Sequence, residues 1–250
     1  MKNNVIKLFQ KGFNYSQDGP GNRLVYHLQG CNLRCPWCSN PEGIFLKPHK
    51  AFEKSAVEMT VEEMLKEIIS CRPMFFDGGG VTFTGGEPTL QWEPLTAVLK
   101  LLRNENINTA VETNGTHPNL TEWVPYIDTW MIDLKHYDTA KHQKITGYSH
   151  ENTIQNIRRI TDMKTMVHIR IPLIGSINDL PEDLQGFADL LSTMNLELIT
   201  VEILPYHEFG KTKWLKCEME YTLTNGFVSK ETVQQLEEIL KKHNINVVHT

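Results

Sequence analysis

Apolar residues along the chain follow two patterns that alternate with each other. Short, nearly continuous apolar runs, typical of parallel strands buried on both faces, lie at residues 24–28, 81–84, 109–112, 130–134, 166–171 and 198–204. Longer segments between them carry an apolar residue at every third or fourth position, which predicts amphipathic helices around residues 61–69, 95–102, 154–160, 184–191 and 229–242. Thr60 and Glu63 form a capping box that marks the start of the first of these helices.

This alternation predicts the fold class and places the polar motifs. Repeated strand–helix units favour an α/β fold with parallel strands, and about six units predict an open, partial (β/α)6 TIM-like barrel. Because we find no linker-like or low-complexity segment, we expect a single domain over residues 1–250. In such folds the chemistry lies at the carboxyl ends of the strands. Polar motifs follow the predicted strand ends here: residues 31–38, 85–88, 112–115, 133–135, Arg170 and 205–208.

Three cysteines form the densest candidate site. Cys31, Cys35 and Cys38 have the spacing Cys-x3-Cys-x2-Cys directly after the first predicted strand, so their thiolates can converge on one iron–sulfur cluster or one zinc ion. Asn32, Arg34 and Pro36 mark an exposed loop, which disfavours three ordinary core cysteines. Zinc is the main alternative, but a structural zinc ion needs four ligands, and Cys71 and Cys217 are isolated in the sequence.

Composition and charge narrow the functional class. The chain has 250 residues, of which 40% are hydrophobic and 22% charged, and a net charge of −5, so no nucleic-acid-binding surface is expected. No segment has the length and apolar character of a signal peptide or a membrane span. We therefore expect a cytoplasmic monomer with no membrane association, and a reducing cytosol disfavours disulfides.

The cysteine loop and its flanks resemble a known family. Cys-x3-Cys-x2-Cys with Trp37 before the last cysteine is similar to the signature of the radical S-adenosylmethionine superfamily. The segment Asp18-Gly19-Pro20-Gly21-Asn22-Arg23 resembles the entry motif of the glycyl-radical-enzyme activating enzymes, notably those that act on pyruvate formate-lyase. Residues 205–214 likewise resemble the Pro-Tyr-His…Gly-x-x-Lys-Trp signature of that group.

The resemblance implies two cofactors and a set of residues for each. It implies one [4Fe–4S] cluster on Cys31, Cys35 and Cys38, with one open iron that binds S-adenosylmethionine. It implies S-adenosylmethionine contacts from Trp37, Cys38, Ser39, Gly85, Gly86, Glu87, Glu112, Asp133, Leu134, Lys135 and His207. A monovalent cation is a further hypothesis, with oxygen ligands from Glu112, Thr113, Met131 and Asp133. Contacts with a partner protein are implied for Asp18, Arg23 and Arg170.

Simpler structural explanations exist for some of these residues. The two glycines at 85 and 86 also suit a tight strand-to-helix turn. Asp133 and Lys135 lie on the same face of a strand and can form a core-facing ion pair. Asp18 and Arg23 can form a loop salt bridge of little energetic weight.

The resemblance also implies the reaction. A flavodoxin or ferredoxin reduces the cluster, S-adenosylmethionine is cleaved to methionine and a 5′-deoxyadenosyl radical, and that radical removes a hydrogen atom from a backbone glycine of a glycyl radical enzyme in anaerobic metabolism. The absence of a cysteine-rich insertion between Cys38 and Thr60 favours pyruvate formate-lyase as the partner. Ser39 is more typical of relatives that carry the insertion, so another glycyl radical enzyme stays open. A radical enzyme acting on a small molecule and a zinc-binding module are the two other hypotheses.

Overall fold

A computed structural model describes residues 4–249 of the chain. It contains eight strands and seven α-helices within these residues. The strands are β1 (Val5–Tyr15), β2 (Asn22–Leu28), β3 (Val57–Thr60), β4 (Gly80–Gly85), β5 (Thr109–Thr113), β6 (Thr129–Asp133), β7 (Val167–Leu173) and β8 (Ile199–Pro205). The helices are α1 (Val61–Ser70), α2 (Trp92–Asn104), α3 (Thr139–Thr146), α4 (Glu151–Asp162), α5 (Pro181–Leu191), α6 (Lys211–Lys216) and α7 (Lys230–Lys242).

The chain folds into two compact units. Among the described residues, the first comprises residues 4–32, 40–113 and 119–131, and the second comprises residues 33–39, 114–118 and 132–249. In the first unit the strand order is β3-β1-β2-β4-β5, with β2, β4 and β5 parallel and β1 antiparallel to both of its neighbours. In the second unit β7 and β8 are parallel. All six predicted strands are therefore present, while the sequence patterns did not predict β1, β3, α3 or α6.

Strand burial explains why the apolar runs predicted these elements. Six of the seven residues of β2 and five of the six residues of β4 are buried, because both strands have neighbours on either side and packing on both faces. The strands β1 and β3 lie at the edge of the first unit's sheet, and four of the eleven residues of β1 are exposed in a row. Their partial exposure and antiparallel pairing place them outside the strand–helix repeat.

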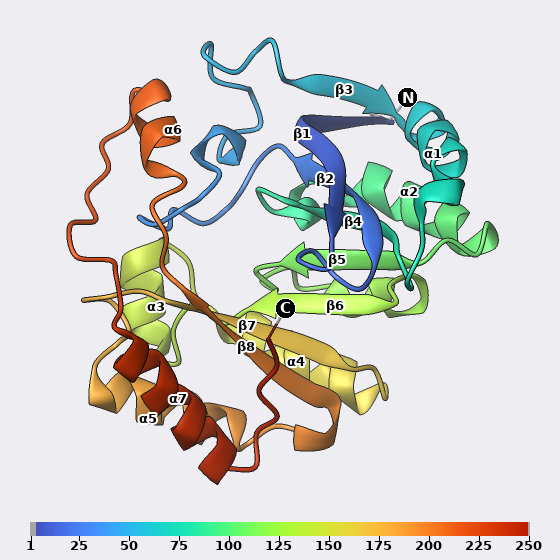
Figure 1. Cartoon of the computed structure of the whole chain (residues 1–250). Coiled ribbons are helices and arrows are strands. Elements are labelled where there is room, and N and C mark those ends of the chain that lie inside the picture. The colour runs from blue at the N-terminus through green and yellow to red at the C-terminus, as the bar shows by residue number, and fades with distance from the viewer. Residues whose placement is uncertain (1–3, 250) are drawn as a thin grey trace. The chain divides into compact units, whose positions relative to one another are not determined.

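The helices begin and pack where the sequence indicates. Thr60 accepts a hydrogen bond from the Glu63 amide at 3.1 Å, and the Glu63 carboxylate accepts one from the Thr60 amide at 2.8 Å, which confirms the capping box of α1. Ser229 caps α7. In the first unit α1 packs against α2, and in the second α5 packs against α7 (Figure 1). Among residues 4–249, no helix combines the length and apolar character that crossing a membrane requires.

Candidate active site

In the first unit, the turn that leads into Cys31 is bonded to the turn that contains the paired glycines. Their strands, β2 and β4, are parallel neighbours, and Leu28 lies opposite Gly85. The Gly86 amide donates to the Leu28 carbonyl at 2.8 Å, and the Glu87 amide donates to the Gly30 carbonyl at 2.6 Å. The fold thus brings these two predicted motifs together at adjacent strand ends.

Both turns depend on glycine. A Cβ atom on Gly86 would lie 2.1 Å from the Gly30 carbonyl oxygen, so any side chain would displace the residue before Cys31. Gly85 has φ of +111° and its backbone passes close to Leu28. The tight-turn interpretation of this motif is therefore correct, and the same close packing supports the backbone next to the first cysteine.

Glu87 is a buried carboxylate that joins β4 to β5. Its side chain is only 1% exposed, and its Oε1 accepts hydrogen bonds from the Thr89 amide at 3.1 Å, the Thr89 hydroxyl at 2.6 Å and the Thr113 hydroxyl at 2.7 Å. These contacts give Glu87 a structural role at the strand ends. Contact of its carboxylate with an ammonium group stays a prediction.

The residues predicted to bind a cation have different surroundings in the first unit. The Glu112 carboxylate accepts a hydrogen bond from Thr84 at 2.6 Å, whereas the Thr113 hydroxyl donates to Glu87. Adjacent residues of a strand point to opposite faces, so the side chains of Glu112 and Thr113 do not converge. Met131 is buried in β6. Binding of a cation by these residues stays a prediction.

In the second unit, the remainder of the cysteine loop lies beside the end of β6. Cys35 and Trp37 are buried, and the Cys38 amide donates to the Cys35 carbonyl at 3.1 Å. Burial raises the pKa of the Cys35 thiol to about 12; the ammonium of Lys135 opposes this shift, while Cys38 and Asp133 add to it. Burial therefore favours the neutral thiol of Cys35 over its thiolate.

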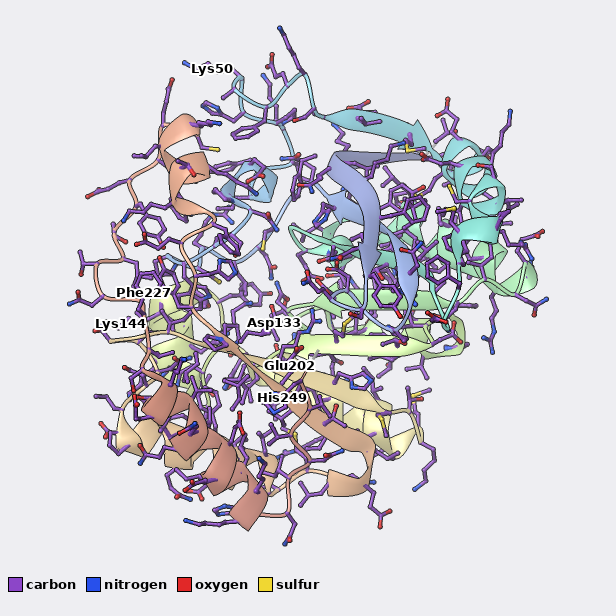
Figure 2. The ribbon with its side chains drawn as sticks, in the orientation of Figure 1. Lys50, Asp133, Lys144, Glu202, Phe227 and His249 are labelled. Carbon is purple, nitrogen blue, oxygen red and sulfur yellow. The ribbon has the colours of Figure 1, made fainter. Side chains whose placement is uncertain are left out.

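Asp133 and Lys135 form the predicted same-face pair. Lys135 Nζ lies 2.6 Å from Asp133 Oδ2, and the side chains are 11% and 33% exposed respectively. Figure 2 labels Asp133 at the end of β6. Leu134, between them, is buried, and its amide donates to the Arg170 carbonyl at 2.8 Å. The ion pair is therefore present, and it lies close enough to Cys35 to influence that thiol.

Arg170 has a partner that the sequence did not reveal. It lies opposite Glu202 in the register of β7 and β8, and its Nε is 2.9 Å from Glu202 Oε2. Both residues are buried, and Glu202 is labelled in Figure 2. In the sequence, Glu202 is the one carboxylate within the largely apolar run of β8, and this pattern could have indicated a buried charged partner. Contact of Arg170 with a partner protein stays a prediction.

His207 and Ser39 are reachable from solvent in the second unit. His207 is exposed just after β8, and its ring stacks on Phe209 with centroids 4.3 Å apart. Ser39 is half-buried, next to Cys38. Neither side chain is buried in the core, and their contacts with a cofactor stay predictions.

The structure corrects the interpretation of Arg23 and changes that of Asp18. Arg23 is completely buried, and its guanidinium donates to Thr82 Oγ1 at 2.7 Å and to the Val81 carbonyl at 2.8 Å. A fully buried side chain cannot contact a partner, so that prediction for Arg23 is wrong, and so is an exposed loop salt bridge. Asp18 is half-buried, and its carboxylate accepts a hydrogen bond from Asn14. A partner contact of Asp18 stays a prediction.

The cysteines suit an iron–sulfur cluster. Cys31, Cys35 and Cys38 are all thiols, with none in a disulfide, and they lie within eight consecutive residues. Cys31 and Cys38 are half-buried and Cys35 is buried, so the loop holds all three sulfurs partly or wholly shielded from solvent. Soft thiolate donors at this spacing fit the iron ions of a cluster.

The comparisons with known proteins identify the class. The profile of the radical SAM superfamily matches residues 25–191. A radical SAM methyltransferase from Sphaerobacter thermophilus has a similar fold, with a TM-score of 0.67 and 18% identity, covering 94% of this chain and 67% of that one. This likeness confirms the predicted α/β, partial-barrel fold class.

Two curated relatives narrow the family. The chain is 38% identical to the pyruvate formate-lyase-activating enzyme of Staphylococcus epidermidis, over 83% of this chain and 84% of the relative. It is 35% identical to the pyruvate formate-lyase-activating enzyme of Clostridium pasteurianum, over 90% and 92% respectively. The chain belongs to the radical SAM superfamily and, within it, to the family of pyruvate formate-lyase-activating enzymes. Membership implies a [4Fe–4S] cluster and S-adenosylmethionine, and it excludes the zinc-binding module.

Proposed function

We propose that this enzyme activates a partner glycyl radical enzyme, pyruvate formate-lyase or a close relative, by removing one hydrogen atom from a backbone glycine. The observation that carries the proposal is the similarity to activating enzymes along most of their length, together with the cysteine loop at the end of β2. When bound, the cluster and S-adenosylmethionine supply the one-electron chemistry that generates the hydrogen-abstracting radical. The protein supplies binding, orientation and exclusion of water.

Each candidate residue has a role that its surroundings support. Cys31, Cys35 and Cys38 would hold three irons, and the ammonium of Lys135 near Cys35 suits both a cluster thiolate and the carboxylate of S-adenosylmethionine. Asp133 orients Lys135 through their 2.6 Å contact. The missing side chains of Gly85 and Gly86 allow close packing against the backbone of Leu28 and Gly30, and contact of the two glycines with S-adenosylmethionine is assigned on the resemblance.

Other residues would complete binding of S-adenosylmethionine. His207, exposed after β8, would contact the adenosyl group, with Trp37, Cys38 and Ser39 beside the adenine. Glu112, Leu134 and the carboxylate of Glu87 are assigned to the same ligand on the resemblance. A monovalent cation would use Glu112, Thr113, Met131 and Asp133.

The partners and setting follow from the same class of reaction. The chain would receive electrons from a flavodoxin or ferredoxin and would contact the glycyl radical enzyme through the loop at Asp18 and through Arg170. We propose a single radical SAM domain that acts as a cytoplasmic monomer in anaerobic metabolism.

Electron paramagnetic resonance tests the proposal directly. Anaerobically reconstituted protein should show a reduced [4Fe–4S] signal that changes when S-adenosylmethionine is added. The signal should be lost in Cys35→Ala and kept in Cys71→Ala, a half-buried cysteine outside the motif. Mixing with pyruvate formate-lyase, S-adenosylmethionine and a reductant should then produce a glycyl radical signal. Stoichiometric zinc without acid-labile sulfide would overturn the assignment of an iron–sulfur cluster. If the cluster-loaded protein produces no radical on pyruvate formate-lyase, the partner is a different glycyl radical enzyme.

A further inference from the structure

The backbone at the last cysteine of the loop is held by a segment far away in the sequence. The Trp214 indole N–H, in α6, donates to the Cys38 carbonyl at 2.9 Å across 176 residues of sequence. Gly210, immediately before α6, packs so closely that a Cβ atom there would lie 2.3 Å from the same oxygen and 2.9 Å from Ser39 Cα. Two features of one short segment thus converge on a single carbonyl group.

Trp214 is in turn anchored to the strands of the second unit through two tyrosines. The Trp214 ring meets the ring of Tyr221 edge-on, with centroids 5.7 Å apart and an interplanar angle of 72°. The hydroxyl of Tyr221 is hydrogen-bonded to that of Tyr206, which is buried. The Tyr206 amide donates to the Leu173 carbonyl at 3.0 Å, at the end of β7. A continuous series of contacts therefore runs from the strand ends to Cys38.

We infer that Trp214, supported by Gly210 and Tyr221, is a positioning residue for the Cys38 sulfur. The inference rests on the proposed function, because it assigns Cys38 to the cluster. The Cys38 amide is already held by the Cys35 carbonyl at 3.1 Å, and the contact with Trp214 holds the other side of the residue. With both backbone groups held, the direction of the Cys38 Cα–Cβ bond is set before any iron is present, and the sulfur can occupy only the rotamer positions around that bond.

Thiol alkylation of the metal-free protein tests this inference without a cluster. Trp214→Phe keeps an aromatic ring and removes the N–H donor together with part of the indole ring. We expect Cys38, resolved by peptide mass spectrometry, to react with iodoacetamide about fivefold faster in this variant, since losing one neutral hydrogen bond shifts a local equilibrium by about that factor. Trp123→Phe is the matched control, because Trp123 donates to Thr96 at 2.8 Å at a position outside the cysteine loop, and its Cys38 rate should equal that of the wild type.

The loaded protein supplies a second readout. Trp214→Phe should lose iron to a chelator several-fold faster than the Trp123→Phe control and should show an altered reduced-cluster spectrum. Unchanged Cys38 alkylation, iron loss and spectrum in Trp214→Phe would overturn the inference while leaving the proposed function intact. A wild type that takes up no cluster would instead overturn the proposed function, and the alkylation result would still decide whether Trp214 holds Cys38. If Trp214→Phe fails to fold, Tyr221→Phe, which removes only a hydroxyl, carries the same expectations.

Discussion

Replacing Arg23 by leucine should destabilise the protein far more than it changes any surface contact. The guanidinium makes four hydrogen bonds of 3.1 Å or less, to Thr82 Oγ1, Asn108 Oδ1 and the carbonyls of Val81 and Pro20. Burial lowers the pKa of Arg23 to about 10, so the charge itself is costly in this position, and the hydrogen bonds offset that cost. Arg23→Leu relieves the cost of the charge and removes this donor from two buried acceptors, Thr82 Oγ1 and the Val81 carbonyl, and from two partly buried ones.

The size of the effect follows from those two opposing contributions. Each acceptor left without a partner costs about 1–3 kcal/mol, and removal of the buried charge returns part of this. We expect a net loss of about 3 kcal/mol in the free energy of unfolding, which is a large share of the roughly 5–15 kcal/mol typical of proteins. For a chain of this length the melting temperature should fall by roughly 6–12 °C.

Urea unfolding followed by circular dichroism measures this loss. Arg72→Leu is the matched control, because Arg72 forms an exposed ion pair with Glu105 at 3.0 Å and should contribute at most about 1 kcal/mol. An Arg23→Leu variant as stable as Arg72→Leu would refute the reasoning. Selective loss of partner binding at wild-type stability would restore Arg23 as a partner contact.

Three further substitutions test other features of the fold and the site. Glu87→Ala should lower the free energy of unfolding in urea by about 3 kcal/mol, because it leaves the buried Thr113 hydroxyl without its acceptor. Glu87→Gln keeps an acceptor and should cost less than half of that. Equal losses in the two variants would contradict this role of Glu87. Gly86→Ala should lower the free energy of unfolding, measured by thermal denaturation, by at least about 2 kcal/mol. Gly12→Ala is the control and should be nearly neutral, because a Cβ atom at Gly12 has no other atom within 4 Å. A Gly86→Ala variant of wild-type stability would show that the turn can relax. Burial lowers the pKa of His142 from 6.5 to about 4, so the unfolded chain binds more protons between these values and stability falls as the pH falls. Unfolding at pH 7 and pH 5 should differ by about 2 kcal/mol through His142, and His142→Gln should remove that part of the difference; an unchanged difference would refute the assignment.

The sequence by itself determined the six strands of the strand–helix repeat, five of the helices and the identity of the central motif. Apolar runs predicted the parallel strands because strands covered on both faces bury mostly apolar side chains. The Thr60 capping box predicted the start of α1 because its hydrogen bonds are local. The spacing of Cys31, Cys35 and Cys38 indicated a shared metal centre because eight residues of chain keep the three sulfurs close.

The tertiary structure decided which partners the polar residues have. Arg23 in a loop motif is consistent with a surface contact, and only the packing of β2 beside β4 buries it against Thr82. Arg170 meets Glu202 because the register of β7 and β8 places them opposite each other. Trp214 reaches Cys38 across most of the chain. Such contacts depend on strand register and on the packing of distant segments, and no local pattern of hydrophobic and polar residues records either.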